Sequence, residues 1–249
     1  MSVGVCRTTV LTLLSTALLA LPVRAQFTNV YQDDSWHFNV SPFAWLNGIS
    51  GVVEAGGETV DLGATSLSDF QLGLHLEVLK KAWIILAEGG YLKYGLQGQA
   101  RDGTPAELDL TEWMGEGAVG YSFGTMRRWF TFLGGVRYLN VEGQTRVQGQ
   151  APESGSLDIW DPYLGLRFFW GVYERVPIIL RGDVGGLQIS DVDLSWRITL
   201  GAGYRFSDRF TVDGGWRWFD LEYKSGSGDE QVIYDVSKNG PYLALTLGF

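Results

Sequence analysis

The residues best able to do chemistry are charged side chains that alternate with small or apolar residues. Counted along this alternation, seven acids and six arginines fall on one and the same face of the predicted strands. A charge inside a protein is costly unless it is paired, and the planar fork of arginine suits carboxylates. We therefore expect a charge-paired network in the interior. Its members are Glu77, Glu88, Glu112, Glu116, Arg137, Asp161, Arg167, Arg181, Asp183, Arg197, Arg205, Asp213 and Arg217.

The two histidines are weak candidates for acid–base catalysis. His37 is expected near the start of the first strand, and His75 on the inward face, two residues from Glu77. A Ser–His–acid arrangement needs the histidine within hydrogen-bond reach of its nucleophile. No serine accompanies His75 on its own strand. We predict no catalytic residue and expect His75 to be a hydrogen-bonding group of the interior, while an enzyme acting on lipid or peptide stays an alternative.

Metal and cofactor sites are not predicted either. The single cysteine, Cys6, lies in the predicted leader, and the two histidines are far apart, which excludes the usual zinc patterns. Glu153, Asp229 and Glu230 fall in predicted loops without the spacing of a calcium loop. The glycine-rich segments lie within strands rather than before a helix, so they indicate no nucleotide site.

The first 25 residues have the pattern of a secretory signal. Arg7 provides a basic start, residues 10–21 are largely apolar, and small residues precede a cleavage site after Ala25. The apolar stretch is too short to span a bilayer as a helix, although a retained anchor is the alternative. We expect a signal peptide at 1–25 and one β-barrel domain at 26–249.

The composition of residues 26–249 points to an exported β protein. Removing Arg7 and Arg24 with the leader leaves a formal charge of 17 − 28 = −11, which argues against nucleic-acid binding. The chain has 10 Trp, 11 Tyr, 13 Phe and 34 Gly. Many aromatics and glycines, combined with alternating apolar residues, are typical of outer-membrane barrels.

Alternation predicts an all-β, antiparallel, up-and-down transmembrane β-barrel of about ten strands, with eight or twelve as alternatives. Several strands exceed the ~9–11 residues needed to cross a bilayer, so their ends should project beyond it. The predicted strands are 36–54, 70–80, 83–101, 106–123, 129–147, 158–171, 177–189, 193–206, 210–224 and 232–249.

Each strand has one apolar and one mixed face, which fits a soluble or a membrane barrel. In the sixth strand, Trp160, Leu164 and Trp170 share one side, while Asp161 and Arg167 share the other. Aromatics recur near strand ends on the apolar face, and glycine mixed with arginine suits a crowded interior. These features favour the membrane barrel, with its apolar face outward, over a soluble periplasmic barrel that binds a small ligand.

The connections differ in length on the two sides of the predicted barrel. Short turns are expected at 80–82, 124–128, 171–176 and 207–209, and longer loops at 55–69, 148–157 and 225–231, with shorter links at 102–105 and 190–192. Short periplasmic turns and longer external loops are usual in bacterial barrels, and an even strand count puts both termini in the periplasm. The loop ends are acidic. They are interpreted either as ordinary solvated loops or as a rim that would concentrate cations at the outer mouth.

Several segments resemble a known group. Gly203-Tyr-Arg-Phe-Ser-Asp-Arg-Phe, followed by Gly215-Trp-Arg-Trp-Phe-Asp, resembles the closing hairpin of small proteobacterial outer-membrane barrels of the outer-membrane protein A and W type. Ser41-Pro-Phe-Ala-Trp-Leu, Trp160-Asp-Pro-Tyr-Leu-Gly-Leu-Arg and Arg181-Gly-Asp-Val-Gly-Gly are similar to an uncharacterised branch of it. The resemblance implies an integral outer-membrane protein and carries over no catalytic residue. Ten strands also suit an omptin protease, but no omptin Asp or His motif matches.

These observations predict a monomeric outer-membrane barrel that is structural or a narrow passive conduit for small solutes or cations. Any conductance should be low and cation-biased, because open porins need about 16–18 strands. The expected partners are outer-membrane lipid, lipopolysaccharide and the barrel-assembly machinery, which would meet the C-terminal strand ending at Phe249. No cofactor is expected, and an adhesion barrel is disfavoured by the short loops.

Overall fold

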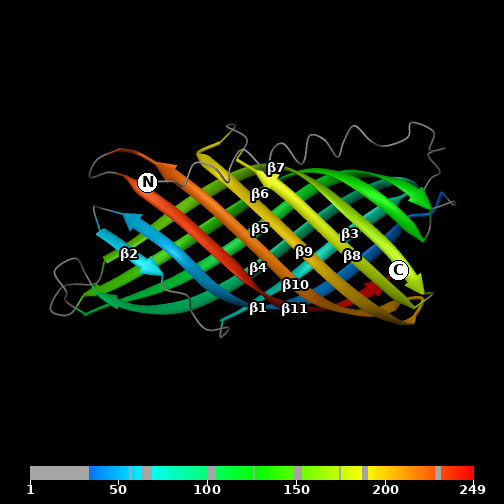
Figure 1. Ribbon diagram of the computed structural model, residues 1–249, viewed down its shortest axis with the longest axis horizontal. Helices are drawn as coiled ribbons and strands as arrows, with labels where there is room; N and C mark the ends of the chain where they lie inside the picture. The colour runs from blue at the N-terminus through cyan, green and yellow to red at the C-terminus, as the bar shows by residue number, and fades with distance from the viewer. Residues whose placement is uncertain are drawn as a thin grey trace, which may run out of the picture.

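The chain folds into a closed antiparallel β-barrel of ten long strands (Figure 1). The computed structural model describes residues 34–55, 58–62, 69–99, 105–125, 127–147, 153–173, 175–186, 190–227 and 231–249. The predicted signal peptide lies outside them. No helix among these residues is long and apolar enough to cross a lipid bilayer.

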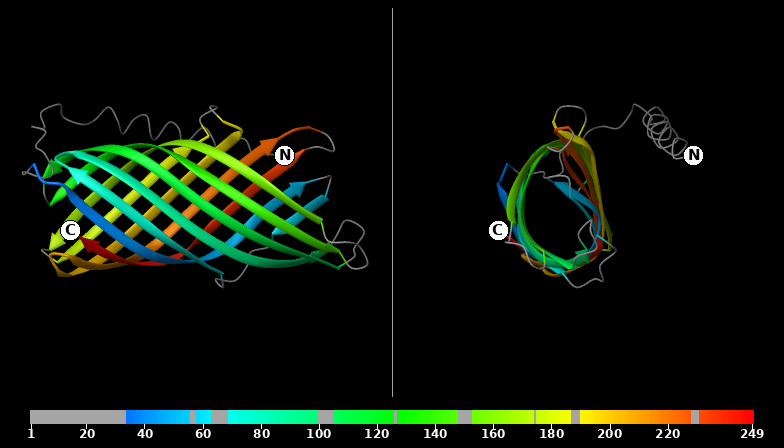
Figure 2. Two further views of the ribbon diagram at one scale, coloured as in Figure 1. Left: turned by 180° about the vertical axis from the view of Figure 1, so that it is seen from behind. Right: turned by 90° about the vertical axis from the view of Figure 1, so that its left-hand side faces the viewer.

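The ten long strands follow one another round the barrel in chain order, and an eleventh, short strand pairs with the end of the first. They are β1 (His37–Ala55), β2 (Glu58–Leu62), β3 (Asp69–Lys80), β4 (Trp83–Gln99), β5 (Pro105–Thr125), β6 (Arg128–Val147), β7 (Glu153–Tyr173), β8 (Val176–Gly185), β9 (Val192–Ser207), β10 (Phe210–Ser225) and β11 (Val232–Gly248). The last strand pairs with the first, from Asn39 opposite Gly248 to Glu54 opposite Ile233. Closure leaves none of the ten strands as a free edge, and the ring is visible end-on in Figure 2.

Two predicted loops proved to be partly strand. The short β2 lies inside the predicted loop 55–69 and pairs with the end of β1, from Gly51 opposite Leu62 to Ala55 opposite Glu58. The neighbouring part of β1 pairs with β3, so β2 and β3 succeed each other along β1. The predicted loop 148–157 was also too long, because β7 begins at Glu153. Both segments are rich in Gly, Ser and Glu, which hides their strand character.

A belt of apolar side chains faces outward around the barrel. On β7, Trp160 and Leu164 are each 60% exposed, whereas Asp161 and Tyr163 between them are buried. The belt on this strand runs from Trp160 to Trp170, which is 11 residues. That matches the ~9–11 residues that a tilted strand needs to cross a bilayer.

Aromatic pairs lie at both borders of this belt. At the border away from the short turns, Tyr91 contacts Trp113 and Tyr138 contacts Trp160, each with ring centroids 4.7 Å apart. Beside the short turns the rings form further pairs: Trp83 with Tyr121, Phe130 with Phe168, and Phe206 with Phe210. Two aromatic girdles around an apolar band are the usual exterior of a membrane barrel.

Beyond the girdle distant from the short turns, the barrel reverses its polarity. We call this part the outer section; it includes β4 from Leu92, β5 up to Glu112, β6 from Leu139 and β7 up to Ile159. Here the inward side chains form a packed apolar cluster, the apolar plug. Its buried members in this section are Trp45, Ile49, Leu92, Tyr94, Leu110, Leu139, Val141, Ile159, Val192, Phe219, Leu221, Tyr223, Tyr234 and Val236, and the cluster extends toward the short turns through Met114, Phe43 and Ala244.

The outward residues of the outer section are polar. Lys93, Glu142, Asp158 and Asp235 are all exposed. An apolar interior with a polar exterior is the arrangement of a water-facing barrel. The same strands therefore form a membrane barrel at one end and a water-facing barrel at the other.

One ion pair is enclosed within the apolar plug. The ammonium group of Lys238 donates to both carboxylate oxygens of Glu112, and the Tyr234 hydroxyl donates to Glu112 at 3.1 Å. Lys238 and Glu112 are each only 1% exposed. The pair thus has its charges satisfied in surroundings that offer little water.

We predict that removing one partner of this pair destabilises the barrel. Glu112→Leu leaves the ammonium group of Lys238 buried without its counter-charge, which should cost about 3–5 kcal/mol of unfolding free energy. The double variant Glu112→Leu/Lys238→Met should recover most of that loss, because no charge is left unpaired. Urea unfolding in lipid vesicles, followed by tryptophan fluorescence, measures both. Equal stability of Glu112→Leu and the parent would contradict the prediction.

Candidate functional site

The charged groups of the membrane section meet in one layer across the lumen, and strand register explains why. Arg137 on β6 lies opposite Glu116 of β5 on one side and Asp161 of β7 on the other. Similarly, Asp183 of β8 lies opposite Arg197 of β9. Inward side chains at matching heights on neighbouring strands converge on the barrel axis.

Arg137 is the most enclosed of these groups. It is 0% exposed and donates to Asp161 at 2.7 Å and to Asp183 at 2.5 Å. Asp161 also accepts hydrogen bonds from the Ser195 hydroxyl at 2.6 Å and the backbone N–H of Gly186 at 2.9 Å. Both charges are therefore compensated in a region without bulk water.

Two further arginines extend the layer. Arg197 donates to Glu116 at 2.6 Å and to Asp183 at 2.9 and 3.0 Å. Arg181 pairs with the same two carboxylates, at 3.0 Å to Glu116 and 3.1 Å to Asp183. Three arginines thus share the carboxylates of Asp183 and Glu116, whereas Asp161 has Arg137 as its counter-charge.

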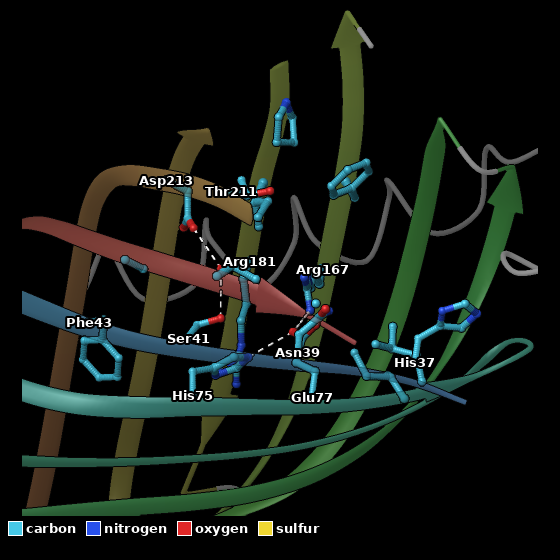
Figure 3. A pocket seen from close by; sticks show the side chains of 18 of the residues that line it. His37, Asn39, Ser41, Phe43, His75, Glu77, Arg167, Arg181, Thr211 and Asp213 are labelled. Atoms are coloured by element: carbon cyan, nitrogen blue, oxygen red, sulfur yellow. Dashed lines mark hydrogen bonds and ion pairs between the residues drawn. The ribbon is translucent and has the colours of Figure 1, made fainter. Parts of the chain in front are cut away.

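The layer continues toward the short-turn end through a histidine. Arg217 donates to Glu88 at 2.8 Å, and Nδ1 of His75 lies 2.9 Å from the other Glu88 oxygen. Nε2 of His75 lies 3.0 Å from Glu77, which also accepts from Arg167 (Figure 3). His75 therefore connects two carboxylates from neighbouring strands.

The structure joins ten of the thirteen residues singled out in the sequence, together with His75, into what we call the charged tier. The ten are Glu77, Glu88, Glu116, Arg137, Asp161, Arg167, Arg181, Asp183, Arg197 and Arg217. The other three are separate. Glu112 lies in the apolar plug with Lys238, Asp213 accepts from the Thr246 hydroxyl at 3.3 Å, and Arg205 is exposed at the short-turn end.

Sequence reasoning missed Lys238 and the linking role of His75. A usable signal existed for Lys238, because it is in phase with the inward residues Gly240 and Tyr242 on β11. For His75 the partner Glu88 lies on the next strand, and its contact depends on the register between β3 and β4. Register between strands is not readable from either strand alone.

A cavity of about 530 Å³, which we call the end cavity, lies between the charged tier and the short-turn end of the barrel. Its mouth includes His37, Asp208, Arg209 and Phe249. Its inner end is formed by tier residues such as Glu88, Arg181 and Arg217, beyond which lie the fully buried Arg137 and Arg197 and then the apolar plug. The end cavity is therefore blind.

His75 is poorly arranged for nucleophilic catalysis. Ser41 lies directly opposite His75 in the pairing of β1 with β3, which is the cross-strand serine that a catalytic pair would need. However, the Ser41 hydroxyl is 2.9 Å from that of Thr246, while both ring nitrogens of His75 face carboxylates. A histidine that donates from both nitrogens has no lone pair with which to accept the serine proton.

No group of three or more His, Cys, Asp or Glu in the described part of the chain is arranged to hold a metal ion.

Comparisons with known proteins report on the fold. No family model matches the sequence, and no curated protein matches it. Among solved structures, the outer-membrane protease OmpT of Escherichia coli aligns with a TM-score of 0.61 and 11% identity, over 88% of this chain and 99% of that one. At this identity the likeness shows a shared barrel fold and nothing about activity.

Two further structures align less well. The transport unit of the autotransporter AIDA-I from Escherichia coli gives a TM-score of 0.45 at 9% identity, covering 97% of both chains. The attachment invasion locus protein Ail of Yersinia pestis gives 0.42 at 10% identity, covering 87% of this chain and all of Ail.

We predict that the charged tier is essential to stability. Arg137→Met leaves Asp161 and Asp183 without their central partner, and breaking a buried pair typically costs about 3–5 kcal/mol. The matched control is Arg146→Met, because Arg146 forms a surface pair with Asp109 at 2.9 Å. Such exposed pairs contribute about 0–1 kcal/mol. Unfolding midpoints in urea distinguish the two, and equal losses would refute the ranking.

Proposed function

We propose that this chain is an integral outer-membrane barrel with a sealed lumen, and that its role is structural rather than that of an open conduit. The observation that carries the proposal is the outward apolar belt around an interior of paired charges. A water-soluble barrel has the opposite arrangement, as the outer section does. The belt therefore favours the membrane over the soluble periplasmic alternative.

The filled interior supports a sealed lumen. A passing ion would have to cross the charged tier, where Arg137, Arg197 and Asp161 are at most 1% exposed, and then the apolar plug. Separating these charges without replacement partners is expensive, and the plug offers an ion no polar contacts along most of its walls. The narrow passive conduit for small solutes or cations therefore becomes the second candidate.

An enzyme acting on lipid or peptide has less support. The fold shared with OmpT carries no catalytic residue to this chain, and His75 is held between Glu77 and Glu88. We further propose the resemblance to the outer-membrane protein A and W group as an evolutionary hypothesis. It rests on the quoted sequence segments.

The membrane setting implies the partners and the orientation. We propose export through a signal peptide cleaved near Ala25, and assembly by the barrel-assembly machinery through β11. Lipopolysaccharide would surround the girdle near Trp113 and Trp160, and both termini would be periplasmic, because the short turns lie at the end where β1 begins and β11 ends. A monomer fits this proposal, since the barrel closes on itself within one chain.

We predict that the refolded protein is silent in a planar bilayer. Heat-modifiable migration on a denaturing gel first confirms that the barrel has folded. The parent and Arg181→Ala should both show no discrete conductance steps, because the apolar plug remains when the tier is weakened. Steps in the parent that change in Arg181→Ala would instead make the protein a conduit through the charged lumen.

We predict that single cysteines report the orientation. Residues 26–249 contain no cysteine, so labelling has no background once the leader is removed. In intact cells of a Gram-negative host, an impermeant maleimide should label Ser227→Cys, which is exposed beyond β10. Ser207→Cys, exposed beside the short turn, should react only after the outer membrane is permeabilised. The reverse pattern would invert the proposed topology.

A further inference from the structure

We propose that the end cavity binds a small organic anion with an apolar body, such as an aromatic or short aliphatic carboxylate, which enters from the short-turn end. The inference goes beyond the proposed structural role but shares its orientation, in which this end faces the periplasm. It rests on the size of the cavity, on unused hydrogen-bond donors in its wall, and on its apolar surfaces.

The size and shape suit a small molecule. The volume of about 530 Å³ lies within the range of ~300–1,000 Å³ that is usual for ligand pockets. Gly201 on β9 makes room for Tyr242, which lines the cavity: an added Cβ at Gly201 would lie 2.0 Å from the Tyr242 hydroxyl.

The acids that line the cavity are largely occupied by the protein itself. Glu77 accepts hydrogen bonds from Arg167 and from the side-chain amide of Asn39, and it contacts Nε2 of His75. Glu88 accepts a hydrogen bond from Arg217 and contacts Nδ1 of His75. The remaining acids are Asp213, which accepts from Thr246, and Asp208 in the exposed turn. A cationic ligand would have to compete with these internal partners.

The arginines, in contrast, keep unused donors. Among the described residues, Arg167 forms hydrogen bonds only through Nη1, which donates to Glu77. Its Nε is buried without a partner, which leaves Nη2 as the donor available to a ligand. Arg205 and Arg209 also line the cavity, are exposed, and have no side-chain partner in the described part of the chain. Guanidinium groups bind carboxylates through paired hydrogen bonds.

The arginines also lie at two heights along the cavity. Arg205 is near the end of β9 beside the mouth, and Arg167 lies deeper, next to Glu77 (Figure 3). An anion that enters would therefore meet one guanidinium at the mouth and another further inside. This arrangement favours uptake of negative charge from the short-turn side.

Apolar side chains form the remaining wall. Trp129 stacks on Phe169 with ring centroids 3.7 Å apart, and Phe43, Ile179 and Pro177 line the same space. Apolar walls with a few polar groups that fix orientation are typical of sites for organic ligands. Inorganic phosphate would use the arginines but not these surfaces, so we expect it to bind more weakly than an aromatic carboxylate.

Trp129 provides a direct readout of binding. The mature chain is labelled with 5-fluorotryptophan and refolded into nanodiscs, and Trp129→Phe identifies the fluorine resonance of Trp129. The probes are benzoate, its neutral isostere benzamide, and inorganic phosphate. Benzoate should shift the Trp129 resonance saturably, whereas benzamide should cause no saturable shift, which also controls for partition into lipid.

The arginines are tested with a matched pair of variants. Arg205→Gln should weaken benzoate binding about tenfold, since it removes a charged hydrogen-bond donor. Arg146→Gln, in the outer section far from the cavity, should bind like the parent. A saturable shift that is lost in Arg205→Gln supports the proposal.

Three results would overturn it: no saturable shift with benzoate, an equal shift with benzamide, or unchanged affinity in Arg205→Gln. Insertion into nanodiscs and heat-modifiable migration are checked in every sample. Failure at that stage would count against the membrane barrel itself, whereas an inserted barrel without benzoate binding would refute only the ligand site.

Discussion

The pairing of buried charges between strands is the constraint on which this barrel depends. Arg137 and Arg197 are satisfied only while β6 to β9 keep their present register, because their partners Asp161 and Asp183 lie on neighbouring strands. A slip of one residue turns every side chain of a strand to the other face. Such a slip would place a guanidinium group in lipid and Trp160 or Leu164 in the lumen. The charged tier therefore selects one register out of several that satisfy the backbone hydrogen bonds.

The tier also separates two different interiors. On one side the end cavity keeps polar groups accessible from the short-turn end, and on the other the apolar plug excludes water. Lys238 and Glu112 show how the plug tolerates charge: each group has its counter-charge within direct contact, with the Tyr234 hydroxyl as a further partner. Along the barrel axis, the interior therefore changes from charged and accessible at the short-turn end to apolar and enclosed in the outer section.

The sequence was sufficient for the architecture but not for these contacts. Period-two alternation located the long strands to within a few residues, because each membrane strand keeps one face toward lipid and one toward the lumen. It failed at β2, where Glu58 and Asp61 suggested a loop, and at the start of β7. The alternation was also assigned one polarity along the whole strand. On β5 the apolar residues actually change face near Glu112 and Trp113, which is why the plug was not foreseen.

Within the candidate site, the inward charges could be picked from their phase, whereas their partners depended on register. Arg205 shared the phase of the others yet lies apart from the tier, because it is near the end of β9 where the lumen meets the mouth. The place of a residue in the strand alternation gives only the direction of its side chain. The height of that side chain along the barrel axis also depends on the shear of the closed sheet, which is the offset between neighbouring strands. Pairing such as that of His75 with Glu88 follows only when both are known.

The reversal of polarity in the outer section has a consequence for the way this protein must be handled. Most membrane barrels owe their rigidity to the surrounding lipid together with the backbone hydrogen bonds of the sheet. Here eight of the ten long strands, all except β3 and β8, contribute described residues to a conventional hydrophobic core, centred on residues such as Trp45, Leu139 and Tyr234. A detergent that replaces the bilayer acts on the belt and does not reach this core. The hydrophobic core of the outer section therefore continues to hold the strands together when detergent replaces the lipid around the other half of the barrel.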